Sequence, residues 1–268
     1  MFKINDEIFN KQHFPDGTQS LKYNTPKCTD ITIEWIYESD EELFTLYCLK
    51  KHIDYHKHPK TTIRLKLAYL PNARMDRTKN SSDVFTLKYF CEIINSLNFD
   101  VVYVRDPHSN VSTALLNRVE CDDMNFWLNK CLRCINCSNL VLFFPDEGAM
   151  KRYSSLIKHP YTFGVKNREW ETGKIKNLIL MNEEMVKDKN ILIVDDICSY
   201  GGTFQFAAEA LKRAGARDIY LYISHAEKNM IDGAMYNGDL IKKIYTTNSI
   251  FKKEYDIKDK VKVFNNFF

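Results

Sequence analysis

Two spacings of apolar residues alternate along the chain. Short continuous apolar runs, such as Leu140 to Phe144 and Ile191 to Val194, are expected for strands that are covered on both faces. Between such runs, apolar residues recur at intervals of three and four, as they do from Phe85 to Leu97, which is the spacing of one helix face. Strands that alternate with helices almost throughout predict an α/β fold, with mostly parallel sheets flanked by helices on both faces.

The predicted elements fall into two similar halves. Strands are expected at 2–9, 31–37, 63–70, 100–104, 140–144, 161–165, 178–182, 190–194, 218–224, 241–247 and 261–264, with a hairpin at 13–23. Helices are expected at 43–55, 85–97, 149–157 and 204–214, with another within 120–139. The first of these helices begins with a capping-box pattern, with Ser39 as N-cap and Glu42 three residues later. We therefore expect one lobe over 1–125 and a second over 126–249, with ligands in a cleft between them, while 250–268 is a candidate to return to the first lobe.

Composition narrows the class of protein without indicating a function. The chain has 268 residues, of which 44% are hydrophobic and 27% charged, as is typical of a globular protein with a large core or two lobes. The formal net charge of +3 and the lack of a long basic run argue against nucleic acid as a partner. No apolar stretch approaches the length of a membrane span, and Met1 to Asn5 does not resemble a signal peptide. Eight cysteines without such a signal favour reduced thiols and a cytoplasmic protein.

Three cysteines, Cys131, Cys134 and Cys137, form two overlapping CxxC pairs. Such spacing can hold a zinc ion when a further ligand completes the site. No second CxxC pair and no nearby histidine pair completes it in this sequence. At helical spacing the three sulfurs would lie along one face, so we favour a cysteine-lined helix face and keep metal binding as the alternative.

The segment from Asn190 to Gly215 is the most informative part of the chain. Asp195 and Asp196 follow its apolar strand, and the turn SYGGT leads into a helix with Thr203 as the expected N-cap. Gly215 is expected to end that helix as its C′ residue. A strand, two acids, a glycine-rich turn and a capped helix in this order favour a ligand site over a plain connection.

This order of groups suits a ribose phosphate. Glycines let backbone N–H groups come close to a ligand, and a helix N-terminus carries partial positive charge, so the turn suits a phosphate monoester. The two carboxylates suit the neutral hydroxyl groups of a ribose, or a metal ion that holds those hydroxyls. Phosphate at the turn and a diol at the acids together describe a ribose 5-phosphate.

Other polar groups also follow predicted strands. Arg74 and Arg77 come after the strand at 63–70 and form a candidate polyphosphate clamp, because a guanidinium group binds two phosphate oxygens at once. His108 lies just beyond the strand at 100–104, where a side chain can reach a ligand at the carboxyl edge of an α/β sheet. The charged stretch at 169–175 is a candidate mobile loop.

These segments occur in the order found in ribose-phosphate pyrophosphokinase (PRPP synthetase), and the chain resembles that family over nearly its whole length. DDICSYGGT also resembles the PRPP-binding loop of type I phosphoribosyltransferases, so this motif alone does not separate the two groups. Seven segments resemble motifs of the family. Phe14–Thr18 resembles FSDGE, Arg74–Arg77 resembles RQDR, Asp106–His108 resembles DLH, and Pro145–Asp146 resembles the start of PDIGG. Lys166–Arg168 resembles KRR, Asp195–Thr203 resembles DDMIDTGGT, and His225 matches the histidine of THP. A simple phosphoribosyltransferase lacks the ATP motifs of the first lobe.

The resemblance implies two type I phosphoribosyltransferase-like lobes and a role for each segment. It implies catalytic roles for Lys166 and Arg168. It implies ATP binding by Phe14, Asp16, Thr18, Arg74, Met75, Arg77 and His108, with the turn at Phe14 reaching adenine bound by a neighbouring subunit. It implies ribose-phosphate binding by Asp195, Asp196, Ser199, Tyr200, Gly201, Gly202 and Thr203. His108 and Asp146 are the implied ligands of Mg²⁺, which accompanies ATP as co-substrate, and a homo-oligomer (a dimer or larger) is the implied assembly.

The departures from the family pattern concern assembly and the acceptor. Thr18 replaces a glutamate and Met75 a glutamine, and the chain ends without the family's usual last helix, which leaves the family's hexameric and regulatory assembly open. In the ribose-phosphate loop, Ser199 replaces an acid and Tyr200 replaces a threonine. Both changes fall where the 5-phosphate of the acceptor is expected. They suit a larger acceptor such as ADP-ribose, which some virus-encoded relatives use to rebuild NAD, although neutral drift explains them equally well.

The expected function is that of a pyrophosphokinase in nucleotide or NAD precursor synthesis. It would transfer the β,γ-diphosphate of ATP to the anomeric 1-hydroxyl of ribose 5-phosphate or ADP-ribose and release AMP. One alternative is a phosphoribosyltransferase that consumes PRPP. Another is an inactive regulatory homologue, against which the retention of both Lys166 and Arg168 speaks.

Overall fold

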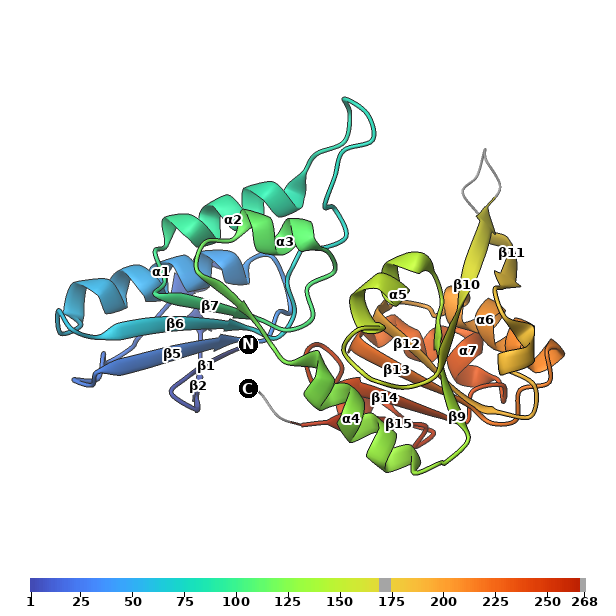
Figure 1. The fold of residues 1–268 in the computed structure, drawn as a ribbon. Coiled ribbons are helices and arrows are strands. Elements are labelled where there is room, and N and C mark those ends of the chain that lie inside the picture. Colours follow the sequence, from blue (N-terminus) through green and yellow to red (C-terminus); the bar gives the residue numbers. More distant parts are fainter. Residues whose placement is uncertain (169–174, 266–268) are drawn as a thin grey trace. The chain divides into compact units, whose positions relative to one another are not determined.

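The computed structural model describes residues 1–168 and 175–265, and only the backbone of residues 166–168 and 175–177 (Figure 1). The candidate mobile loop at 169–175 therefore lies outside the described residues, apart from Ile175. The chain divides between Asp122 and Asp123 into two units, which we call the N-terminal and C-terminal lobes. Among the described helices, none has the length and apolar character needed to cross a bilayer.

The N-terminal lobe is built on a six-stranded sheet in the order β2-β1-β5-β6-β7-β8. Its strands are β1 (Phe2–Ile4), β2 (Glu7–Phe9), β5 (Asp30–Trp35), β6 (Thr62–Leu67), β7 (Val101–Val104) and β8 (Val119–Cys121). The strands from β5 to β8 are parallel, and β1 is antiparallel to both of its neighbours. The helices are α1 (Glu42–His56), α2 (Thr86–Ser96) and α3 (Asn110–Leu115), and the separate hairpin is β3 (Gln12–His13) with β4 (Gln19–Ser20).

One face of the N-terminal sheet forms the core of that lobe. In β6, Ile63, Leu65 and Leu67 are buried and pack with apolar residues of α1 and α2, whereas the residues between them are half-buried. The opposite face carries charges, including an ion pair between Lys66 Nζ and Glu34 Oε1 at 3.6 Å. Among the described residues, the helices of this lobe therefore pack on one face of the sheet rather than on both, as its alternating apolar and polar strands favour.

The C-terminal lobe is built on a seven-stranded sheet in the order β11-β10-β9-β12-β13-β14-β15. Its strands are β9 (Leu140–Phe144), β10 (Tyr161–Arg168), β11 (Ile175–Leu180), β12 (Asn190–Cys198), β13 (Ile219–Ala226), β14 (Lys243–Thr247) and β15 (Val261–Phe264). All neighbouring pairs are parallel except β10 with β11. The helices are α4 (Met124–Ile135), α5 (Glu147–Tyr153), α6 (Gly202–Arg213) and α7 (Ala234–Asn237), with short 3₁₀ turns η1 (Glu183–Met185), η2 (Lys228–Asp232) and η3 (Lys253–Tyr255).

This second sheet is covered on both faces, as its continuous apolar strands predict. Alternate residues of β9 and β12 join two separate core clusters, one with α6 and α7 and the other with α4 and α5. Two mostly parallel α/β lobes thus confirm the expected fold class. The idea that residues 250–268 return to the first lobe is wrong for the described part, because β15 pairs in parallel with β14 at the edge of the second sheet.

Several element boundaries differ from the sequence expectation. The single strand expected at 2–9 is a hairpin, because Asn5 and Asp6 both take positive φ (49° and 70°), which suits a tight two-residue turn. The helix α3 and the strand β8 were not expected. The strand β12 continues through Cys198, beyond the expected end at Val194, because β13 pairs with it up to that residue.

The predicted capping box at the start of α1 is wrong. The N-cap is Glu41, without a side-chain capping bond, and the carboxylate of Glu42 turns into the core instead. Glu42 Oε2 accepts hydrogen bonds from Trp35 Nε1 at 2.8 Å and from the backbone N–H of Glu38 at 2.9 Å. Its other oxygen meets the amino group of Met1. Glu42 therefore ties the chain start, β5 and α1 together.

The three cysteines also differ from expectation. Cys131 is buried on α4, Cys134 is exposed on the same helix, and Cys137 follows the left-handed C-cap residue Asn136. They therefore do not share one helix face. Burial raises the pKa of the Cys131 thiol well above its usual value, which keeps it protonated.

We expect Glu42→Ala to lower the free energy of unfolding by about 2–3 kcal/mol, because the buried N–H of Trp35 and the partly buried N–H of Glu38 lose their acceptor. Urea unfolding followed by tryptophan fluorescence measures this loss. The matched control is Glu41→Ala, which removes an exposed carboxylate one residue earlier and should cost less than about 0.5 kcal/mol. An equal loss in both variants would contradict the assigned role of Glu42.

Candidate active site

The polar groups of the C-terminal lobe gather at the carboxyl ends of three neighbouring strands. Asp146 follows β9, Asp195 and Asp196 lie near the end of β12, and His225 lies near the end of β13. The chain leaves β9 to form β10 on one side and later returns to form β12 on the other side. Such a reversal of strand order is where open α/β sheets bind ligands.

The acidic pair, Asp195 and Asp196, is nearly enclosed, with 8% and 3% of each residue exposed. The Nη2 atom of Arg152 donates to Asp195 Oδ1 at 3.3 Å and to Asp196 Oδ1 at 2.9 Å. The backbone N–H of Asp196 also donates to Asp195 Oδ1, at 3.0 Å. Two carboxylates therefore share one cation in the interior of the lobe.

Burial raises the pKa of the Asp195 carboxyl well above its ordinary value, and the neighbouring negative charge of Asp196 raises it further. Arg152 acts in the opposite direction, and the more distant charge of Asp146 adds to the rise. The Asp195 carboxyl therefore holds a proton more readily than an ordinary aspartate does. Its protonated form can donate a hydrogen bond to a neutral hydroxyl group, and its ionised form can accept one.

Asp146 has a structural duty at the start of α5. Its side chain is the N-cap, and Oδ1 accepts a hydrogen bond from the backbone N–H of Ala149 at 3.0 Å. The same short helix carries Arg152 in its last turn. Asp146 and Arg152 are thus placed by one element, and Arg152 is a site residue that sequence reasoning missed.

The turn between β12 and α6 presents backbone groups rather than a capping side chain. Gly201 is the N-cap with a left-handed φ of 77°, and no side chain makes a capping bond. The prediction of Thr203 as N-cap is therefore wrong, since the helix begins at Gly202. An uncapped helix start leaves N–H donors for an anion, as the ribose-phosphate expectation requires.

The other end of α6 agrees with the sequence. Gly215 has a φ of 88°, its N–H donates to the carbonyl of Lys212, and the N–H of Ala216 donates to the carbonyl of Leu211, both at 3.0 Å. This is a Schellman arrangement, with Gly215 at C′ as predicted.

A second segment, residues 230–235, fixes the shape of the turn. A Cβ added to Gly233 would lie 1.8 Å from the carbonyl oxygen of Tyr200, and one added to Gly201 would lie 2.7 Å from Cε of Met235. The backbone at Tyr200 is therefore in close contact with Gly233, whereas the side chain of Tyr200 is 59% exposed. Sequence reasoning did not connect Gly233 with the turn, because the contact joins residues far apart in the chain.

His225 has the environment of a core histidine. It is 2% exposed, and its Nδ1 lies 2.8 Å from the hydroxyl of Ser249. That hydroxyl donates to the carbonyl of Ser224 at 3.1 Å, so the bond with the imidazole is made by an N–H of His225. These contacts orient the ring at the end of β13.

The backbone of β10 brings the expected catalytic residues to the same edge of the sheet. β10 runs parallel to β9 until Phe163 pairs with Phe144, the last residue of β9, so Lys166 and Arg168 lie beyond the end of β9. In the hairpin with β11, Lys166 pairs with Leu178 and Arg168 with Ile175. The side chains of Lys166 and Arg168 lie outside the described residues.

In the N-terminal lobe, the expected ATP-binding residues lie in two places. Arg74, Met75 and Arg77 follow β6, and His108 follows the neighbouring parallel strand β7, so both segments lie at the carboxyl edge of the same sheet. The guanidinium of Arg77 is 3.7 Å from Asp76 and its side chain is 79% exposed. Nearby, the buried Arg105 pairs with Asp122 at 2.8 Å, a contact that sequence reasoning missed.

The remaining expected ATP-binding residues form the tip of the β3–β4 hairpin. Phe14 is exposed, and Gly17 has a left-handed φ of 86°. Asp16 Oδ1 accepts bonds from the hydroxyl and the backbone N–H of Thr18, at 2.7 and 2.9 Å. These bonds lower the pKa of Asp16, with the hydroxyl of Thr18 as the main cause. Thr18, which replaces the family's glutamate, thus stabilises the turn.

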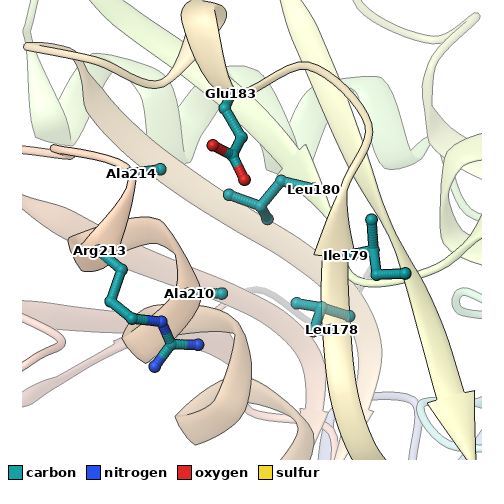
Figure 2. Close-up of a pocket in the computed structure, with 7 residues that line it drawn as sticks. All are labelled: Leu178, Ile179, Leu180, Glu183, Ala210, Arg213 and Ala214. Carbon is teal, nitrogen blue, oxygen red and sulfur yellow. The ribbon is translucent and has the colours of Figure 1, made fainter.

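A cavity of about 260 Å³ lies away from these groups. It is lined by Leu178, Ile179, Leu180, Glu183, Ala210, Arg213 and Ala214, between β11 and the last turn of α6 (Figure 2). The Gly201 turn lies at the other end of the twelve-residue helix α6, roughly 16 Å along its axis. Neither the acidic pair nor the turn opens into this cavity.

Comparison with known proteins connects these groups to one family. The family model described as "Phosphoribosyl transferase domain" matches residues 121–256. The chain is 27% identical to the ribose-phosphate pyrophosphokinase of Sulfurisphaera tokodaii, over 88% of this chain and 82% of that protein. It is 25% identical to the ribose-phosphate pyrophosphokinase of Porphyromonas gingivalis, over 90% of this chain and 78% of that protein. The crystal structure of phosphoribosylpyrophosphate synthetase from Mycobacterium smegmatis matches with a TM-score of 0.74 at 15% identity, over 96% of this chain and 85% of that one, which shows a shared fold.

If the turn between β12 and α6 binds the phosphate of ribose 5-phosphate, we expect Gly233→Ala to lower the affinity for that ligand by about tenfold or more, because the new methyl group displaces the carbonyl of Tyr200 and so the turn. Isothermal titration calorimetry measures the change. The matched control is Gly238→Ala, three residues beyond that segment, where the added Cβ meets the carbonyl of Ala234 at 3.0 Å and does not touch the turn. Unchanged binding in a folded Gly233→Ala protein would contradict the role of residues 230–235.

Proposed function

The chain belongs to the phosphoribosyl transferase domain family, and we propose that it is a ribose-phosphate pyrophosphokinase. In this reaction the anomeric 1-hydroxyl of a ribose 5-phosphate moiety attacks the β-phosphorus of ATP. A bond forms between O1 and Pβ, the bond from Pβ to the α,β-bridging oxygen breaks, and AMP leaves with that oxygen. The hydroxyl proton is released, and the product is a ribose 1-diphosphate ester.

The observation that carries this proposal is the unit formed by β12, the turn and α6. Its acidic pair, Asp195 and Asp196, presents groups for a ribose diol, and its turn at Gly201 presents a helix N-terminus for the 5-phosphate. Both lie at the position where the strand order of the sheet reverses. We propose Asp195, Asp196 and residues 199–203 as the ribose-phosphate site.

The N-terminal lobe favours pyrophosphokinase over phosphoribosyltransferase. The family model matches residues 121–256, which lie almost entirely in the C-terminal lobe. The two pyrophosphokinase relatives, in contrast, match about nine tenths of the chain. Arg74, Arg77 and His108 lie at one edge of the N-terminal sheet, where guanidinium groups can bind the phosphates of ATP. We propose this edge, together with Met75, as the ATP phosphate side, with Phe14, Asp16 and Thr18 near adenine.

Positive charge at the transferring group is the second requirement of the reaction. Charge grows on the phosphoryl oxygens as Pβ moves to O1, and fixed cations offset it. We propose Lys166 and Arg168 for this role, because β10 carries both beyond the end of β9 at the edge of the sheet that holds Asp146 and the acidic pair. The exposed Phe14 supports a homo-oligomer in which one chain reaches the adenine bound by another.

Magnesium is proposed to arrive as the complex with ATP. Mg²⁺ is commonly held by one or two carboxylates together with substrate phosphates, and when bound it offsets phosphate charge. Among the described residues, no three histidine, cysteine or acidic side chains gather into a metal cluster. The protein therefore fits an ion whose remaining ligands are oxygens of the ATP phosphates. Asp146, which follows β9, and His108, which follows β7, are each proposed as a protein ligand of such an ion.

The acceptor is proposed to be ribose 5-phosphate, with ADP-ribose as the second candidate. Tyr200 favours the larger acceptor, because its ring is exposed within the proposed phosphate-binding turn, directly before Gly201. An exposed aromatic ring at this position can stack on an adenine attached through a second phosphate. Ser199, which stands where the family has an acid, removes a negative charge that would repel such a diphosphate.

A product assay tests the function and the acceptor together. The protein is incubated with magnesium-ATP and either ribose 5-phosphate or ADP-ribose, and phosphorus NMR identifies AMP and a new diphosphate ester. AMP with ribose 5-phosphate alone supports the main proposal, and AMP with ADP-ribose alone supports a role in NAD metabolism. No AMP with either acceptor would overturn the pyrophosphokinase and favour a PRPP-dependent transferase or an inactive homologue.

We expect Lys166→Ala to lower kcat by about 100-fold or more while changing the affinity for ATP much less, because the lysine acts on charge that develops during transfer. Steady-state kinetics and ATP titration separate the two effects. The control is Lys189→Ala, which removes an exposed lysine just before β12 and should leave both values unchanged. Near-normal turnover in Lys166→Ala would contradict the catalytic role.

A further inference from the structure

Arg152 has no counterpart among the residues expected from the sequence, yet it contacts both members of the acidic pair. A single nitrogen, Nη2, donates to Asp195 Oδ1 at 3.3 Å and to Asp196 Oδ1 at 2.9 Å. We propose that Arg152 is a positioning residue that serves as the internal cation of this pair. It holds both carboxylates for the ribose hydroxyls and takes the place of a divalent cation at the same oxygens. The inference rests on the proposed function, in which the pair binds the ribose diol.

The side chain of Arg152 is held in place by packing against neighbouring residues. Its guanidinium carbon lies 5.3 Å from the centre of the Tyr153 ring, and its side chain is 23% exposed. Tyr153 is buried and stacks on Phe144 of β9 with ring centres 6.4 Å apart. Helix α5 also packs against β9 and β12. The position of the guanidinium is therefore set by the same strands that carry the acidic pair.

The charges of Asp195 and Asp196 explain why a cation next to both carboxylates is favourable. Two neighbouring carboxylates in an enclosed site repel each other, and a cation that contacts both reduces that repulsion. A planar guanidinium keeps a fixed geometry toward two acceptors, whereas a lysine supplies a compact point charge. Arginine at position 152 thus does more than add charge, because it also fixes the spacing of the two Oδ1 atoms.

A magnesium ion at the same oxygens would conflict with this arrangement. Mg²⁺ requires an octahedral set of oxygens at about 2.0–2.1 Å, and the Oδ1 atoms of Asp195 and Asp196 already accept from Arg152. An ion in that position would also lie beside the positive guanidinium. The sequence alone left open whether the pair holds ribose hydroxyls directly or through a second metal ion. The contacts of Arg152 favour direct binding, with Mg²⁺ carried by ATP.

Manganese binding tests the inference without turnover. Mn²⁺, which electron paramagnetic resonance detects when free, is titrated without nucleotide into the wild-type protein and the Arg152→Gln, Arg152→Lys, Asp196→Asn and Arg152→Gln/Asp196→Asn variants. We expect Arg152→Gln to gain a Mn²⁺ site about tenfold tighter than any wild-type site, and the double variant to lose it. Wild type and Asp196→Asn should bind Mn²⁺ alike. A wild-type site that Asp196→Asn abolishes, or no gain in Arg152→Gln, would overturn the inference.

Ribose 5-phosphate binding supplies a second readout that a purely structural role would not move. Calorimetry in the presence of a chelator should show binding by the wild-type protein, a loss of about tenfold in Arg152→Gln, and recovery of that loss when Mn²⁺ is added. Arg152→Lys should lie between the two, because it keeps the charge and loses the fixed geometry. Ribose 5-phosphate binding by the wild-type protein that requires Mn²⁺ would overturn the inference.

The two measurements separate this inference from the proposed function. If the wild-type protein does not bind ribose 5-phosphate, the proposed function fails, while the Mn²⁺ titrations still decide whether Arg152 holds the cation position. If Arg152→Gln does not fold, as circular dichroism would show, the comparison of wild type with Asp196→Asn and Arg152→Lys decides. The inference then stands only if Asp196→Asn leaves Mn²⁺ binding unchanged.

Discussion

The burial of two adjacent carboxylates at the end of β12 is the constraint on which the candidate site depends. Removing one partner from a buried ion pair typically lowers the free energy of unfolding by about 3–5 kcal/mol, so the fold depends on the cation contributed by Arg152. Arg152 reaches the pair only because α5 begins directly after β9, and α5 begins there because Asp146 caps it. The neighbouring strands β9 and β12 and the short helix α5 thus form one unit, in which the residue before a seven-residue helix supplies the cap and the helix itself supplies the charge partner.

The turn that we propose to bind the phosphate depends on packing in a similar way. Its left-handed residue Gly201 and its carbonyl at Tyr200 are both in contact with residues 230–235, and Met235 belongs to the same core cluster as Phe204 of α6. Backbone N–H groups can hold an anion only if their direction is fixed before the ligand arrives. The shape of the turn therefore comes from the core of the lobe as much as from its own glycines.

Features encoded locally were predictable from the sequence, and features that depend on distant partners were not. The bounds of β9 and β15, the apolar stripe of α2 and the C′ role of Gly215 follow from local spacing and turn chemistry. The capping box failed because Glu42 finds Trp35 and Met1 instead, and β12 exceeded its predicted length because β13 continues beside two aspartates. Arg152 was visible as a basic residue, but its partners lie 43 and 44 residues later. Pairing across such distances is set by strand order, which hydrophobic periodicity does not reveal.

The same contacts explain how the choice of acceptor can change without loss of the proposed phosphate site. The backbone of Tyr200 is held against Gly233, while its side chain points to solvent, so side chains at 199 and 200 can vary without moving the N–H groups that follow. Asp195 and Asp196 have no such freedom, since both are enclosed and bonded to Arg152. Selection for a new acceptor would therefore act on Ser199 and Tyr200 and leave the acidic pair and the glycines intact. The sequence DDICSYGGT has that pattern, with both aspartates and both glycines kept and the change confined to the residues between them.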